Sequence, residues 1–442
     1  MSTSIKQDAA MIRPIAATSL LSSPWVIFGT LYVAYGVSMV LRLMPAFAGN
    51  AIRSDPALQV NLEALGGMLA SGTTGALCGK FFWGWAADRW GARLIFPLAL
   101  VIESLGVAVF SQAGSLSVMQ AAFFVTLMAQ AGGWPCMTRV VQAWALPQQQ
   151  GRVWGLLSTS SRVGTLVASL GPAALAGVLP WRQVLLVAAA VGVVAAVLAL
   201  LLLPSPAAAR IQPVPAADGG YGGRDRSPSH AMDDCSLVRA FGRFFSSAQF
   251  LLMAAALMGM AVLWDFLLLA PMMLQDGLKL SNADALRVVS AVPFGSLLAL
   301  LAGGYVFDRL SRRARAFVMG GLLAVATLCL TMFSVMPAFG LTRTVQLLAS
   351  TGLLFVFGMC LSPCYYIPVS VFSTEFGGRH CGVLVALLDA IGFAAVAVFC
   401  LWSGRIVESS GWPVLLHWLT GIGLAAAGLL LVFLLRESRT TR

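Results

Sequence analysis

Four charged residues lie inside stretches of the sequence that are otherwise apolar. Two are arginines, Arg42 and Arg162, and two are aspartates, Asp265 and Asp389. Charges in such surroundings are expensive, by roughly 3 kcal/mol each on insertion scales, and usually serve a function. A guanidinium group offers a permanently charged, planar fork of donors to a carboxylate or a phosphate. A partly buried carboxyl group can instead carry a proton.

The four charges form two pairs at similar spacing. Asp265 follows Arg42 by 223 positions, and Asp389 follows Arg162 by 227. Three interpretations remain open. The arginines could bind an anion while the aspartates carry a coupling proton. Both signs could bind a zwitterion such as an amino acid or a peptide. Alternatively, the four residues could form two ion pairs that only stabilise a closed state.

Neutral polar and aromatic residues accompany these charges and could add specificity. We expect substrate contacts from Tyr35, Gln130, Ser158, Ser161, Trp264, Tyr365 and Tyr366. Glu103 also lies in an apolar stretch, but we expect it to have a structural partner.

The elements that hold these residues are apolar helices. The chain of 442 residues is 59% hydrophobic and 10% charged, whereas a soluble domain is about 25% charged. A membrane-spanning helix needs about 20 apolar residues. Twelve segments qualify, near 24–48, 62–86, 94–111, 116–140, 153–177, 182–204, 248–275, 284–307, 316–336, 345–372, 380–405 and 412–435. The sequence therefore predicts an all-α membrane protein with twelve transmembrane helices.

The net charge of +11 is a signal of topology. Of the 28 Lys and Arg residues, 20 fall in the termini and the even-to-odd connections, and five in the odd-to-even connections. This bias places both termini in the cytoplasm and makes a nucleic-acid partner unlikely to be needed. We expect a multi-pass protein of the plasma or inner membrane. The eight cysteines form no metal or disulfide pattern, and no nucleotide-binding or hydrolase motif occurs, so we expect no cofactor and no enzymatic activity.

The chain divides into two similar halves. A polar stretch rich in Pro, Gly and Arg predicts a cytoplasmic linker at 205–247, between six-helix bundles at 1–204 and 248–442. Gly84-x-x-x-Asp88-Arg89 returns as Gly304-x-x-x-Asp308-Arg309, and Pro135-Cys136 returns as Pro363-Cys364. This repeat predicts two pseudo-symmetric bundles with a substrate site between them, as in alternating-access transporters.

Charged residues at the predicted cytoplasmic helix ends could act as gates. Asp88 lies beside Arg89 and Arg93, and Asp308 beside Arg309. Arg139 and Glu375 are a further candidate pair. Acids held by arginines can latch one conformation and release it in another.

The two-copy pattern resembles the major facilitator superfamily over essentially the whole chain. The stretch from Gln130 to Arg139, the Gly-Arg opening of the fifth helix and the stretch from Ser362 to Phe393 resemble the organophosphate:phosphate antiporter family. That family's Arg-Lys pair in the first helix is absent, and Arg42 lies about a turn away. Its arginine in the seventh helix falls near Leu263, and its fifth-helix histidine position is Ser161. The scaffold therefore resembles that family, whereas its phosphate clamp does not carry over.

These observations predict a monomeric secondary transporter for a small polar organic anion, either a carboxylate or a phosphate ester. Transport would proceed by alternating access, coupled to protons or to exchange, with the lipid bilayer as the only other partner. A transporter-like solute sensor, a zwitterion transporter and a drug exporter remain as alternatives.

Overall fold

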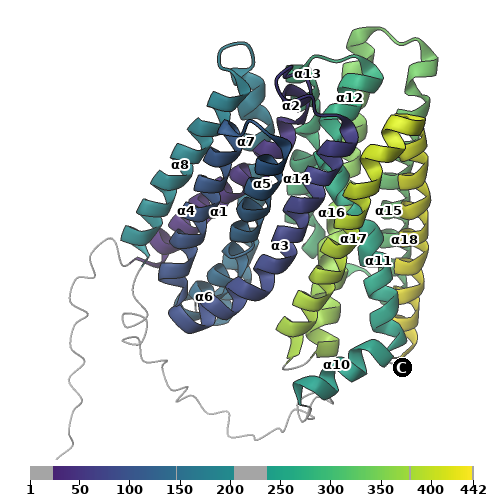
Figure 1. Cartoon of the computed structure of the whole chain (residues 1–442). Coiled ribbons are helices and arrows are strands. Elements are labelled where there is room, and N and C mark those ends of the chain that lie inside the picture. The colour runs from purple at the N-terminus through teal and green to yellow at the C-terminus, as the bar shows by residue number, and fades with distance from the viewer. Residues whose placement is uncertain (1–22, 146, 204–235, 378–379, 441–442) are drawn as a thin grey trace, which may run out of the picture.

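The computed structural model describes residues 23–145, 147–203, 236–377 and 380–440, which are almost entirely helical. The helices form one elongated bundle in which the two halves of the chain lie side by side (Figure 1). Each of the twelve predicted segments coincides with one helix or with consecutive helices. The sequence prediction of an all-α membrane protein is confirmed.

The first half begins at Pro24, whose fixed φ suits the first turn of a helix. Its helices are α1 (Pro24–Phe47), α2 (Gly49–Arg53), α3 (Leu62–Trp90), α4 (Ala92–Gln112), α5 (Leu116–Gln130), α6 (Gly133–Trp144), α7 (Pro147–Leu175) and α8 (Trp181–Leu202).

The second half repeats this order. Its elements are α11 (Ala248–Asp265), η2 (Phe266–Leu268), α12 (Ala270–Leu278), α13 (Asn282–Val289), α14 (Ala291–Arg309), α15 (Arg312–Val335), η3 (Met336–Phe339), α16 (Arg343–Gly377), α17 (Cys381–Ser410) and α18 (Trp412–Thr440). Among the described residues, ten segments are long and apolar enough to cross a membrane. Helices α3 and α7 are also 29 residues long but carry more polar residues.

Two of the helical passages are interrupted beside predicted site residues. The α5–α6 passage breaks at Ala131 and Gly132, where Pro135 has no N–H to bond back to Ala131. The α11–α12 passage breaks immediately after Asp265, in the 3₁₀ turn η2. Pro271, in the first turn of α12, disfavours a continuous α-helix through this point. Both breaks let side chains leave the regular helix surface.

One helix was not predicted from the sequence. Helix α10 (Leu237–Ser246) lies inside the segment predicted as a linker and crosses one end of the bundle (Figure 1). The side chain of Ser236 caps it by accepting a hydrogen bond from the backbone N–H of Arg239. Phe244 is fully buried and contacts the rings of Phe250 and Phe376. Residues 204–235 of the predicted linker lie outside the described residues.

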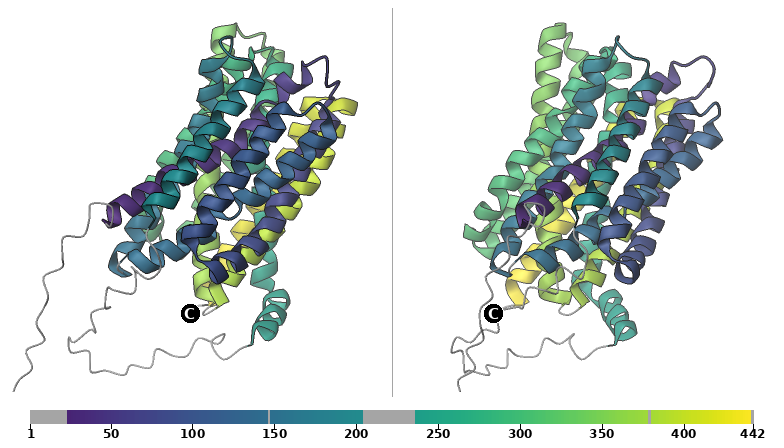
Figure 2. Two further views of the ribbon diagram at one scale, coloured as in Figure 1. Left: turned by 60° about the vertical axis from the view of Figure 1, so that its left-hand side comes forward. Right: turned by 90° about the vertical axis from the view of Figure 1, so that its left-hand side faces the viewer.

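We name the two ends of the bundle for their contents. The terminal end carries α10, the start of α1 and the end of α18, as Figure 2 also shows. The distal end carries α2, α12 and the start of α3. The ribbons of the two halves meet at the distal end and diverge toward the terminal end (Figure 1).

Close backbone contact seals the seam between the halves at the distal end. A Cβ atom on Gly404 of α17 would lie 2.3 Å from the Leu62 carbonyl oxygen of α3. A Cβ atom on Gly66 of α3 would lie 2.5 Å from the Cys400 carbonyl oxygen. Only glycine permits this approach, so α3 and α17 are in backbone contact there.

Polar contacts across the seam surround this glycine contact. The Arg53 guanidinium donates two hydrogen bonds of 2.7 Å to the Asp276 carboxylate. Arg405 pairs with Glu63 at 2.5 Å, and the Glu408 carboxylate accepts a hydrogen bond from the Asn61 amide. These pairs join the halves only at the distal end, so the structure is a state closed at that end.

Candidate functional site

Arg162 extends across the seam into aromatic surroundings. It belongs to α7 of the first half, is 4% exposed, and places its Cζ 4.5 Å from the ring centre of Trp264 and 4.7 Å from that of Tyr366. Both aromatic residues belong to the second half. Its Nε has no hydrogen-bond partner. A cation–π contact contributes about 2 kcal/mol at best, which does not replace a counter-ion for a buried guanidinium.

An aromatic cluster of the second half holds this guanidinium. Trp264 stacks on Tyr365 at 6.0 Å between ring centres and meets Tyr366 edge-on at 5.9 Å. Tyr365 and Tyr366 are themselves in edge contact at 4.8 Å. The break after Asp265 and the position of α16 therefore bring Trp264, Tyr365 and Tyr366 together, as the sequence analysis listed them separately.

The first half contributes a second row of rings. The ring of Trp134 lies 6.0 Å from that of Tyr35 and 4.9 Å from that of Trp154. Gly133 makes this packing possible, because a Cβ there would lie 2.8 Å from the Tyr35 ring. Trp154 and Trp134 were not predicted as site residues, although each lies near a predicted one in the sequence.

Arg42 is the second cation at the seam. One Nη of Arg42 donates a hydrogen bond of 3.2 Å to the Gln130 side-chain oxygen, and its Cζ lies 5.5 Å from the Phe393 ring centre. Its positive charge acts on the carboxyl group of Asp265. Asp265 is half-buried and makes no hydrogen bond or ion pair with any described residue. The structure thus brings Arg42, Gln130 and Asp265 to one region without joining the two charges.

Asp389 has a partner that the sequence analysis missed. Its carboxylate lies 2.5 Å from the Nζ of Lys80, and that Nζ also lies 4.5 Å from the Phe393 ring centre. We had counted Lys80 with the basic connection after the second segment, but α3 continues to Trp90 and carries Lys80 within the helix. The apolar neighbours of Lys80 on both sides were the available signal. Asp389 is therefore paired across the seam with Lys80 and not with Arg162.

Glu103 lies inside the first half, away from the seam. It is 1% exposed, and one carboxylate oxygen accepts a hydrogen bond of 2.8 Å from the Ser38 hydroxyl of α1. Its other oxygen has no partner. This geometry agrees with the expected structural contact between α4 and α1.

The predicted serines make their hydrogen bonds within α7. The hydroxyl of Ser158 donates to the carbonyl of Trp154 at 2.7 Å, and that of Ser161 donates to the carbonyl of Ser158 at 2.9 Å. Both hydroxyls are therefore engaged with their own helix in this state.

The predicted gate residues lie at the terminal end. Asp88 and Asp308 stand near the ends of α3 and α14, but their side chains lie outside the described residues. Arg89 and Arg139 are exposed, and Arg93 is half-buried near the start of α4. Arg309 covers the Tyr305 ring at 3.8 Å.

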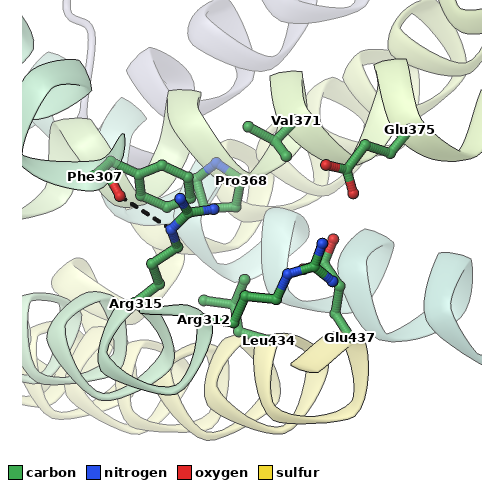
Figure 3. Close-up of a pocket in the computed structure, with 8 residues that line it drawn as sticks. All are labelled: Phe307, Arg312, Arg315, Pro368, Val371, Glu375, Leu434 and Glu437. Atoms are coloured by element: carbon green, nitrogen blue, oxygen red, sulfur yellow. Dashed lines mark hydrogen bonds between the residues drawn. The ribbon is translucent and has the colours of Figure 1, made fainter. Parts of the chain in front are cut away.

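Glu375 lines a small pocket within the second half. Figure 3 shows its carboxylate facing the same space as Arg312 and Glu437, with Arg315 beside Phe307. The Nε of Arg315 donates a hydrogen bond of 3.0 Å to the Phe307 carbonyl. The structure therefore places Glu375 in a charged cluster of α15, α16 and α18.

Comparison with known proteins identifies the scaffold. The family model of the Major Facilitator Superfamily matches residues 26–380. The chain is 24% identical over 386 residues to the protein named "Putative glycerol-3-phosphate transporter 1" of Arabidopsis thaliana, covering 80% of this chain and 71% of the relative. It is 24% identical over 392 residues to the hexuronate transporter of Bacillus subtilis (strain 168), covering 86% and 87%.

A solved structure shows the same fold. The nucleoside transporter NupG superimposes with a TM-score of 0.70 at 15% identity, over 93% of this chain and 99% of that chain.

Proposed function

The chain belongs to the major facilitator superfamily, and on that premise we propose that it moves a small organic anion by alternating access, with Arg162 as the binding cation. As a member of this family it is a multi-pass secondary transporter and not an enzyme. The observation that carries the proposal is the state of Arg162. It is buried at the seam, its neighbours are aromatic rings, and its Nε has no partner.

The balance of charge at the seam favours an anion. Lys80 and Asp389 neutralise each other at 2.5 Å. The remaining seam charges are Arg42, Arg162 and Asp265, which leave one positive charge in excess. At reduced dielectric this excess attracts an anion strongly. A carboxylate or a phosphate ester would supply both the missing charge and the missing hydrogen-bond acceptor for Arg162.

The relatives support the same class. Glycerol 3-phosphate and hexuronates, named in the descriptions of the two matched proteins, are both organic anions. The differences from the antiporter family lie in the clamp, since Leu263 and Ser161 occupy the positions where that family carries an arginine and a histidine. We infer that this chain recognises its anion through Arg162 instead.

Asp265 is the best candidate for a coupling proton. It is half-buried at the break between α11 and η2 and has no partner among the described residues. The charge of Arg42 acts on it, so protonation of Asp265 and binding of an anion would alter the same electrostatic balance. Movement of a proton with the anion follows from this arrangement.

A zwitterionic substrate is the second candidate. The proximity of Arg42 and Asp265 favours it, because a ligand carrying both signs could contact both groups. The test below separates the two classes.

The orientation is also a proposal. Arg239, Arg309, Arg312 and Arg315 lie at the terminal end. By the positive-inside rule that end faces the cytoplasm, so both termini are cytoplasmic and this state is open inward.

Counterflow uptake in proteoliposomes tests the function. The panel contains carboxylates, phosphate esters, amino acids and organic cations, each used to preload vesicles. We expect counterflow with an anion class and its loss in Arg162→Ala. The matched control is Arg343→Gln, whose side chain is 62% exposed at the distal end. Counterflow by amino acids alone would favour the zwitterion, and full activity of Arg162→Ala would reject the proposal.

A further inference from the structure

We infer that the anion recognised at Arg162 carries a planar aromatic ring, so that the substrate class is a small aromatic monocarboxylate. This inference narrows the proposed function and rests on it. It follows from the chemistry of the side chains around Arg162, from the hydrogen bonds that those side chains already make, and from the charge available at the seam.

Aromatic rings dominate the surroundings of the free donor. Trp264 and Tyr366 lie 4.5 and 4.7 Å from the Cζ of Arg162, and Tyr365 packs against both. With rings against its carbon, the guanidinium remains open toward its Nε, which has no partner. A carboxylate that reaches this donor brings the rest of its molecule beside Trp264 and Tyr366. A flat ring fits there by stacking or edge contact.

The neutral polar groups nearby are already engaged. The hydroxyls of Ser158 and Ser161 donate to carbonyls of α7. The Gln130 amide accepts from Arg42 and lies against the sulfur of Met39. A sugar acid would bury several hydroxyl groups that each need a partner. An aromatic ring needs none, so this site favours it over a polyhydroxylated acid.

The available charge favours one negative charge. Arg42 is held by Gln130 and Lys80 by Asp389, and both cations lie near the Phe393 ring. Arg162 is the seam cation whose donor is free. A carboxylate is satisfied by one guanidinium, whereas a phosphate dianion would draw on a second cation. The site therefore suits a monocarboxylate better than a phosphate ester.

Equilibrium binding to the purified full-length protein tests this inference. The probes are benzoate, its neutral counterpart benzamide, glucuronate and glycerol 3-phosphate, measured by titration calorimetry. We expect benzoate to bind at least tenfold more tightly than each of the other three. Tyr366→Leu should weaken benzoate binding about tenfold and Tyr366→Phe should restore it, because the ring and not the hydroxyl makes the contact.

The control variant is Trp418→Leu in α18, whose side chain is 61% exposed and outside the seam. It should bind benzoate as the wild type does. Binding of glucuronate or glycerol 3-phosphate in preference to benzoate would overturn the aromatic inference and leave the anion function standing. Binding of none of the three anions would overturn both. Equal affinity for benzamide and benzoate would show that Arg162 does not select an anion, and would also overturn both.

Discussion

Replacing Gly404 by alanine should open the seam at the distal end. The added methyl group would lie 2.3 Å from the Leu62 carbonyl oxygen and 2.7 Å from the Glu63 Cα. Both are backbone atoms of α3, which cannot rotate away as a flexible side chain would. Helices α3 and α17 must therefore separate where they now hold the two halves together.

The size of the effect follows from this geometry. Ordinary van der Waals contact would require the methyl group to move away by about 1 Å, and overpacking of this kind costs about 1–3 kcal/mol. A cost of about 2 kcal/mol shifts an equilibrium roughly 30-fold. The partly exposed Arg53–Asp276 pair contributes about 1 kcal/mol at most, or roughly fivefold. The helix contact should therefore dominate the closure of the distal end.

Cys400 is a built-in reporter for this opening. It is 1% exposed and its thiol contacts Thr73 across the seam. In a variant whose single cysteine is Cys400, we expect Gly404→Ala to raise the rate of maleimide labelling at least tenfold. Asp276→Asn should raise it only a few-fold.

A matched glycine controls for the substitution itself. Gly421 of α18 has no atom within 4 Å of its ideal Cβ position, so Gly421→Ala should leave both labelling and melting temperature unchanged. An unchanged labelling rate in a folded Gly404→Ala protein would refute the reasoning. A larger effect of Asp276→Asn than of Gly404→Ala would do the same.

Three further predictions concern charged residues. Lys80→Met should lower the melting temperature more than Lys80→Met combined with Asp389→Leu, because removing one partner of a largely buried pair strands the other charge; equal melting temperatures would exclude a structural role for the pair. Asp265→Asn should flatten the pH profile of counterflow if this carboxyl carries the proton, and an unaltered profile would assign it to packing. Partial burial alone would raise the pKa of Asp276, but the hydrogen bonds and charge of Arg53 hold that pKa below its usual range. The Arg53–Asp276 contact therefore stabilises the closed distal end above about pH 4 and is lost as pH falls through the lowered pKa; Cys400 labelling should rise in acid, and Asp276→Asn should remove most of that rise.

The helices and the two-half arrangement could be predicted because their signals are local. Apolar runs of sufficient length define the membrane segments, and the repeat of the Gly84–Arg89 and Gly304–Arg309 motifs marks the halves. Helix α10 was missed because its ten residues lie in a polar, arginine-containing stretch. Its burial of Phe244 depends on Phe250 and Phe376, and Phe376 is distant in the sequence.

The partners of the charged residues could not be predicted. Equal spacing suggested that Arg162 corresponds to Asp389, but symmetry relates positions in the two halves and does not show which side chains touch. The pairing of Asp389 with Lys80 depends on the register of α3 against α17, which the backbone contact at Gly404 sets. The aromatic setting of Arg162 likewise needs α7, α11 and α16 to meet at one level of the bundle.

The affinity of the purified protein for its transported anion in the Arg162→Gln variant tests the central claim most directly. Glutamine keeps a polar side chain but removes the charge and the fork. Loss of a charge-assisted hydrogen bond of about 1.5–3 kcal/mol predicts an affinity roughly 10–150-fold weaker, with Arg343→Gln unchanged. Wild-type affinity in a folded Arg162→Gln protein would contradict the account, because the anion would then be held elsewhere.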